Sequence, residues 1–154
     1  MYLGSAPAGA TLVKAYANWT YLTNFLGDAG ERTVKINGTT IGPGGTSLSY
    51  GDIDLNWQTA YAVSYTADIT GIVQAGGFDS LYQIEQAVDD PNSGGLGEGF
   101  SIVAVYTHPD EPERDVSLYK GYTGTRTGTA SGTMTFDEYD GSRRLPVHFF
   151  LNGL

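Results

Sequence analysis

The sequence predicts an all-β protein, an antiparallel, jelly-roll-like β-sandwich of about eight strands with at most one short helical turn. The first observation is composition: 22 glycines and 11 tyrosines, with few strong helix formers, favour strands and turns. The second is periodicity, since apolar and polar side chains alternate through most segments. The third is the regular spacing of turn signals between those segments, which is typical of antiparallel sandwiches.

The first half of the chain contains four expected elements. Residues 11–19 alternate as a strand, with one face made of Leu12, Lys14, Tyr16 and Asn18 and the other of Val13, Ala15, Ala17 and Trp19. Residues 32–38 form a short strand that ends in an Asn-Gly turn. Residues 39–48 form a loop or an edge strand interrupted by Gly-Pro-Gly-Gly, and residues 60–68 form a strand.

A helical turn is expected at residues 68–77, with Asp68 or Thr70 as its cap and Gly76 as its stop. Residues 80–88 are expected to form a strand, and residues 89–99 a loop. Two strands then flank the loop at residues 107–114, and two further strands are expected at residues 133–136 and 145–153.

The chain is expected to form one sandwich domain, residues 10–154, preceded by an extended N-terminal arm, residues 1–9. A start rich in glycine, alanine and proline frays in isolation, so the arm is expected to lie on the sheet edge of a neighbouring subunit.

Charge and cysteine content exclude several functions. A formal net charge of −9 disfavours binding to nucleic acid or to an anionic membrane. The absence of cysteine excludes disulfides, thiol catalysis and cysteine-ligated zinc. No apolar run approaches the length of a membrane span, so membrane insertion is not expected.

The loop at residues 107–114 has two interpretations. Pro109 and Pro112 stiffen it, and Arg114 can pair with neighbouring acids, so it is predicted to be a rigid connector whose exposed ion pairs contribute little. The alternative is a contact loop in which His108 is a ligand or a pH-sensitive group. The other histidine, His148, is expected to be a packing residue of the last strand.

Two sets of residues are candidates for ligand binding. Trp57, which lies in a polar segment and is the better candidate for exposure, and Trp19 are the candidates for an aromatic platform that stacks on sugars. The alternative is core packing and cross-strand pairing, where aromatic residues also concentrate. Asp89, Asp90 and Asn92 lie in a glycine-rich loop and are the candidate Ca²⁺ ligands, Ca²⁺ being the one cofactor considered. The acids at residues 52–54 and 137–140 are interpreted as solvated turns.

The stretch from Gly99 to Gly121 carries a resemblance. Its matching residues are Gly99, Ser101, Val103, Val105, Tyr106, Pro109, Pro112, Arg114, Val116, Leu118, Tyr119 and Gly121. The pattern resembles an uncharacterised domain family of surface and secreted proteins in methanogenic archaea and Gram-positive bacteria, over roughly residues 8–122. The sequence departs from that pattern at Thr107-His108 and at Lys120. The resemblance implies an extracellular β-sandwich in which Tyr106, Arg114 and Tyr119 lock the loop over the end of the sandwich.

The sequence therefore predicts a non-enzymatic structural module at the cell surface, outside the cell or on a virion, as a subunit of a layer, sheath or filament that associates with itself or with neighbouring subunits. The alternative is a carbohydrate-binding or adhesion module stabilised by calcium, which rests on fold-level analogy. A small glycoside hydrolase with two opposed carboxylates is the third hypothesis. No nucleophile elbow, phosphate loop or dinucleotide motif supports catalysis, so no catalytic residue is proposed.

Overall fold

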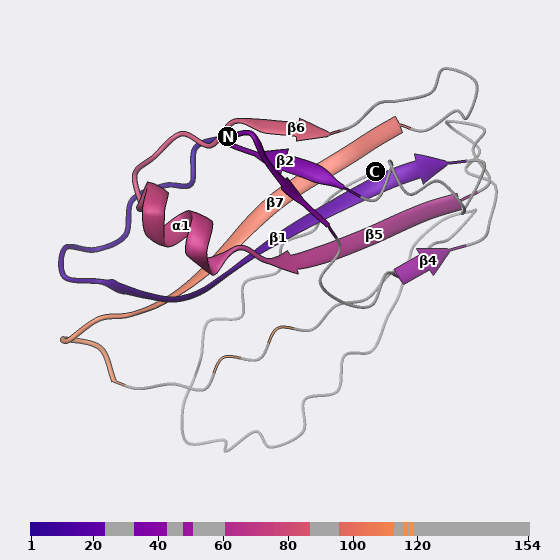
Figure 1. Cartoon of the computed structure of the whole chain (residues 1–154). Coiled ribbons are helices and arrows are strands. Elements are labelled where there is room, and N and C mark those ends of the chain that lie inside the picture. The colour runs from indigo at the N-terminus through magenta and orange to yellow at the C-terminus, as the bar shows by residue number, and fades with distance from the viewer. Residues whose placement is uncertain are drawn as a thin grey trace, which may run out of the picture.

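The computed structural model describes residues 1–23, 33–42, 48–50, 61–86, 96–112, 116 and 118. These residues form two antiparallel sheets and one short helix (Figure 1). The elements are β1 (Thr11–Thr23), β2 (Val34–Ile36), β3 (Thr39–Ile41), β4 (Leu48–Tyr50), β5 (Tyr61–Asp68), α1 (Thr70–Gly76), β6 (Ile84–Gln86) and β7 (Leu96–Thr107). The mostly β, sandwich-like class is therefore confirmed.

The larger sheet is built around β1. Its strand order is β4-β5-β1-β7, and the smaller sheet has the order β3-β2-β6. In the centre of the larger sheet, Trp19 lies opposite Tyr65 of β5 on one side and Phe100 of β7 on the other. The alternation predicted for residues 11–19 and 60–68 thus reflects two long, adjacent strands.

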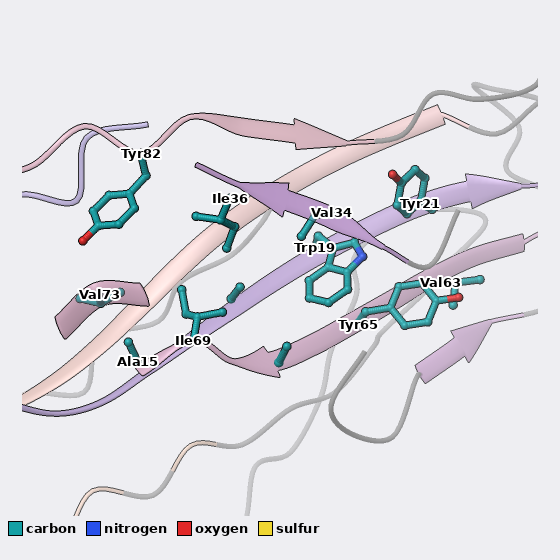
Figure 2. Close-up of a cluster of buried hydrophobic side chains, with 12 residues drawn as sticks. Ala15, Trp19, Tyr21, Val34, Ile36, Val63, Tyr65, Ile69, Val73 and Tyr82 are labelled. Carbon is teal, nitrogen blue, oxygen red and sulfur yellow. The ribbon is translucent and has the colours of Figure 1, made fainter. Parts of the chain in front are cut away.

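The core lies between the larger sheet, the smaller sheet and α1 (Figure 2). It contains Ala15, Ala17, Trp19, Tyr21, Val34, Ile36, Val63, Tyr65, Ala67, Ile69, Val73 and Tyr82. The Trp19 and Tyr65 rings pack with centroids 5.6 Å apart and planes tilted by 31°. Because the larger sheet contributes alternate residues only, one of its faces supplies most of this apolar contact.

A bulge at the start of β1 changes the predicted alternation. The pairing of β1 with β7 shifts register between Leu12 and Lys14. Leu12 packs against the core, whereas Val13 and Lys14 are both exposed. An extra residue at a bulge reverses the inward and outward faces, so Val13 does not share the buried face of Ala15 as the simple alternation predicts.

The smaller sheet begins with the predicted hairpin. Asn37 and Gly38 both have positive φ, 50° and 77°, as the two central residues of a tight hairpin turn require. The side chain of Asn37 also accepts a 2.9 Å hydrogen bond from the Gln83 N–H, which ties the turn to the segment before β6. β3 is an edge strand, one of the two alternatives expected for residues 39–48.

Helix α1 begins differently from the prediction. Its N-cap is Ile69, which makes no side-chain cap bond, and not Asp68 or Thr70. The buried Ile69 side chain anchors this end in the core, while Asp68 Oδ1 accepts a 2.9 Å bond from the Thr70 N–H. The helix ends at Gly76 as predicted, and Gly77, with φ 79°, donates its N–H to the Val73 carbonyl at 2.8 Å.

Several strand bounds differ from expectation. β6 is shorter than residues 80–88, β7 begins inside the loop expected at 89–99, and β4 was not expected as a separate strand. Val116 and Leu118, predicted to lie in a return strand, are exposed and have no strand assignment. The strands expected after residue 120, and with them the jelly-roll connectivity, lie outside the described residues. No described helix is long and apolar enough to cross a membrane.

Candidate functional site

The N-terminal arm pairs with its own chain. The Leu3 N–H donates to the Ser80 carbonyl at 3.2 Å, and the Asp79 N–H donates to the Gly4 carbonyl at 2.8 Å. Tyr2 forms an isolated antiparallel bridge with Leu81. We call residues 79–82 the acceptor segment. Figure 1 shows the N-terminus beside the chain that leads into β6.

The outer end of the arm meets Tyr82. The Tyr82 N–H donates to the Met1 carbonyl at 2.7 Å, and the Met1 amino group donates to the Tyr82 carbonyl at 2.6 Å. The Tyr82 ring is buried, and its hydroxyl donates to the Gly77 carbonyl at 2.8 Å. Burial raises the pKa of the Tyr82 hydroxyl. The acceptor segment is therefore fixed to the core and to the end of α1, and it offers a rigid main-chain edge to the arm.

Besides the buried Tyr82, this pairing contains side chains that lie partly against the core and others that face solvent. Leu3 packs against the core. Leu81 is 78% exposed, Tyr2 55% and Met1 46%. The Tyr2 hydroxyl donates to a carboxylate oxygen of Asp79, the residue that adopts a positive φ of 61° at the start of the acceptor segment. The paired segments thus present apolar side chains to solvent.

A further exposed aromatic residue, Tyr106, contacts Phe78, which directly precedes the acceptor segment in the chain. The rings of Phe78 and Tyr106 meet edge to face, with centroids 5.9 Å apart and planes at 76°. Tyr106 is 43% exposed. We call Met1, Tyr2, Leu81, Phe78 and Tyr106 the arm-end surface. The resemblance implied that Tyr106 locks the loop beside Arg114 and Tyr119; the partner that the structure gives it is Phe78, while Arg114 and Tyr119 lie outside the described residues.

The loop after β7 holds the base of the arm. Nδ1 of His108 accepts a bond from the Asp110 N–H at 3.2 Å, so the ring proton lies on Nε2. Nε2 then donates to the Ala8 carbonyl at 2.9 Å. A turn closes when the Glu111 N–H donates to the His108 carbonyl at 3.0 Å. Pro109 and Pro112 are exposed in this loop. The described part of the loop is thus a connector that also fixes the arm at Ala8.

A second polar cluster joins α1 to β1. Lys14 Nζ lies 2.7 Å from Asp68 Oδ2. The Thr70 hydroxyl donates to Asp68 Oδ1 at 2.6 Å and accepts from the Ala15 N–H at 3.0 Å. The bonds from Lys14 and from Thr70 hold the pKa of the Asp68 carboxyl well below its usual range, and Asp68 raises that of Lys14. These contacts fix the start of the helix, which is a structural role.

The structure corrects one predicted ligand site. Trp19 is 1% exposed and lies in the core, so its ring offers no face to a sugar at the surface. The other candidates, Trp57 for stacking and Asp89, Asp90 and Asn92 for Ca²⁺, lie outside the described residues and stay predictions. Over the described ranges, no group of three or more histidine, aspartate or glutamate side chains comes together to hold a metal ion.

The sequence contained an unused signal for the arm-end surface. In the segment before and within β6, Leu81, Gln83 and Glu85 alternate on the exposed face, whereas Tyr82 is buried. A single exposed leucine is common at protein surfaces, so this signal was weak and gains meaning only from the exposed Tyr2 opposite it. Its pairing with Tyr2, 79 positions earlier, has no local signal and was missed.

A scan against protein-family models, a search of curated proteins and a search of solved structures each found no match to this chain. The resemblance over residues 99–121 to a family of surface domains therefore stays a prediction.

Proposed function

We propose that this chain is a non-enzymatic structural module that assembles with copies of itself at a cell surface, in the extracellular space or on a virion. The observation that supports this function best is the arm-end surface. Leu81, Tyr2 and Met1 are all about half exposed or more, although they belong to two segments that are ordered against each other. Tyr2 and Leu81 are cross-strand neighbours, and contiguous exposed apolar side chains are typical of protein interaction sites.

The chemistry of this surface fits a protein partner better than a charged ligand. Leucine, methionine and tyrosine supply contact area, and tyrosine and methionine are enriched at protein interfaces. The carboxylate of Asp79, in the acceptor segment, is engaged by the Tyr2 hydroxyl. A net charge of −9 keeps copies soluble and repels them at long range, so short-range apolar contact has to supply the attraction.

Replacing Leu81 tests the proposal. The wild-type protein is expected to form particles larger than one chain, with a mass that rises with protein concentration. Leu81→Ser is expected to lower that mass to the monomer value, because it removes the most exposed apolar side chain of the surface. Light scattering coupled to gel filtration, over a hundredfold range of concentration, measures both masses.

Val13→Ser is the matched control, since Val13 is an exposed apolar residue at the β1 bulge and outside the arm-end surface. It is expected to assemble as the wild type does. A wild-type protein that stays monomeric at every concentration contradicts the proposed function. If Leu81→Ser and Val13→Ser both lose assembly, the interface between copies extends beyond the arm-end surface.

Within the described residues, nothing favours the alternative of a carbohydrate-binding or adhesion module. Trp19 is buried in the core, and the remaining predicted ligand residues lie outside the described ranges. An aromatic platform for sugars needs rings whose faces reach solvent. Assembly is therefore the function that the geometry supports.

A further inference from the structure

We propose that copies of this chain are joined by exchange of the N-terminal arm: residues 1–4 of one copy leave their own acceptor segment and pair with residues 79–82 of a second copy. This inference rests on the proposed assembly function and deepens it, because it names the two segments that mate. The second copy supplies the same bonds that the structure shows within one chain.

The pairing is made by main-chain hydrogen bonds, which are the same whichever copy supplies the arm. Leu3 and Gly4 each share one N–H to carbonyl bond with the acceptor segment, and the Met1 carbonyl shares another. The Leu3 side chain packs against the core, and the Tyr2 hydroxyl bonds to Asp79. An arm from another copy makes an identical set of contacts, so exchange changes the source of the strand and not its interactions.

The arm is attached through a short connection that suits exchange. Gly4 has a φ of 90° and Gly9 a φ of 92°, and Pro7 lies between them. The chain turns back on itself where the Ala10 N–H donates to the Pro7 carbonyl at 3.0 Å. Short hinge segments are the places where structural elements exchange between copies. In the closed form this connection folds residues 1–4 back onto their own domain.

The exchange leaves the base of the arm in place and moves only its outer end. The His108 side chain holds the Ala8 carbonyl, and Gly9 lies against His108 and Pro109. Residues 1–7, when extended, span roughly 23–25 Å at 3.3–3.6 Å for each residue. This length is the reach available to an exchanged arm. Leu81, Tyr2 and Met1, exposed in the single chain, then lie at the junction of two copies, where burial is favourable.

Engineered cysteines test the exchange directly, because the natural chain contains none. The bonds around Tyr2 and Leu81 are made by their neighbours, Leu3 with Ser80 and Met1 with Tyr82, so Tyr2 and Leu81 are a non-hydrogen-bonded pair with closely spaced side chains. Such a pair is near enough for a disulfide. One chain carries Tyr2→Cys and a second, of different mass, carries Leu81→Cys.

The two single-cysteine chains are mixed at assembling concentration and oxidised with glutathione, and their cross-linked peptides are identified by mass spectrometry. Exchange predicts a disulfide between position 2 of one chain and position 81 of the other. A Val13→Cys chain in place of the Leu81→Cys chain is the control and is expected to yield at least tenfold less of this heterodisulfide. Equal yields from the two mixtures overturn the exchange.

The double variant Tyr2→Cys/Leu81→Cys separates this inference from the proposed function. Oxidised at high dilution, it closes a disulfide within one chain and locks the arm in place. Cysteine at position 81 keeps a small apolar side chain, unlike serine, so the reduced double variant is expected to assemble, although less than the wild type. Exchange predicts that the oxidised, locked form is monomeric at concentrations at which the reduced form assembles. If the locked protein assembles like the wild type, exchange is wrong and assembly through another contact stands. If the wild type itself never assembles, the proposed function fails and exchange fails with it.

Discussion

The hydroxyl group of Thr70 joins the start of α1 to β1. It accepts the Ala15 N–H at 3.0 Å and donates to Asp68 at 2.6 Å. Thr70→Val keeps the shape of the side chain and leaves the Ala15 N–H without its partner. We expect the free energy of unfolding, measured in urea, to fall by about 1–3 kcal/mol, the usual effect of an unpaired main-chain donor.

Thr70→Ser is the matched control because it retains the hydroxyl. Its expected change is within about 0.5–1 kcal/mol. A serine variant that loses as much stability as the valine variant contradicts this account, because a retained hydroxyl then fails to preserve the stability.

Asp68 makes stability depend on acid pH. Its bonds from Lys14 and Thr70 lower its pKa in the folded protein, so the unfolded chain takes up the proton first as the pH falls. The stabilisation from Asp68 is complete above the unfolded pKa, about 3.9, and is lost as the pH falls from there toward the lower folded value. We expect the wild type to lose more unfolding free energy than Asp68→Asn between about pH 5 and pH 3.

Urea unfolding at several pH values measures how steeply the free energy of unfolding of each protein changes with pH. Lys14→Gln removes the largest cause of the shift and leaves both Thr70 bonds, so its slope is expected to lie between those of the wild type and Asp68→Asn. Superimposable profiles for all three proteins are the outcome that counts against this account.

At the scale of single residues, the sequence predicted faces better than roles. Ala15, Ala17 and Trp19 were expected on one face of a strand, and all three are buried. The aromatic type of Trp19 was compatible with a sugar platform or with a core. Its burial is decided by the smaller sheet that covers it, through Val34 and Ile36, and this packing has no counterpart in the local sequence.

At the scale of elements, the two glycines of α1 are expected to respond in opposite ways to alanine. A Cβ at Gly76 lies 2.5 Å from the Tyr82 hydroxyl oxygen and 2.9 Å from the ring carbon that carries it. The ring is buried and its hydroxyl is bonded to Gly77, so it has little freedom to move aside. Gly76→Ala is expected to destabilise the protein by about 1–3 kcal/mol, the usual effect of overpacking.

Gly71 provides the control within the same helix. A Cβ there meets nothing within 4 Å. Gly71→Ala is expected to stabilise the protein by about 0.4–1 kcal/mol, because alanine restricts the unfolded chain and favours the helix. Thermal or urea unfolding measures both variants. A loss of stability in Gly71→Ala, or none in Gly76→Ala, contradicts this account of the close contact with Tyr82.

Elements with a strong local signal were predicted well. The Asn37-Gly38 turn was predicted because its positive φ angles suit those residue types. The end of α1 at Gly76 was predicted for a similar local reason. The N-cap was not, because a buried Ile69 overrides the polar residues on either side of it. The bulge at Val13 was missed because it depends on the pairing of β1 with β7.

At the scale of the whole molecule, alternation established the class of fold but not the partners of each strand. β1 pairs with β5 and β7, which begin about 40 and 75 residues after the end of β1. The arm was expected to lie on a neighbouring subunit, and in the structure it lies on its own acceptor segment. The tendency of the arm to pair was visible in the sequence, whereas the identity of its partner depends on the fold around Tyr82.

Trp19 gives the folded protein an internal optical probe. Its indole is held in apolar surroundings, 5.6 Å from the Tyr65 ring, and its Nε1 has no hydrogen-bond partner in the part of the chain that the structure describes. An indole in such surroundings emits fluorescence at shorter wavelengths than one in water, and its fixed neighbours make its near-ultraviolet dichroism strong. In a Trp57→Phe variant, which leaves Trp19 as the one tryptophan of the sequence, this signal therefore reports when the two sheets are closed over each other, without any added label.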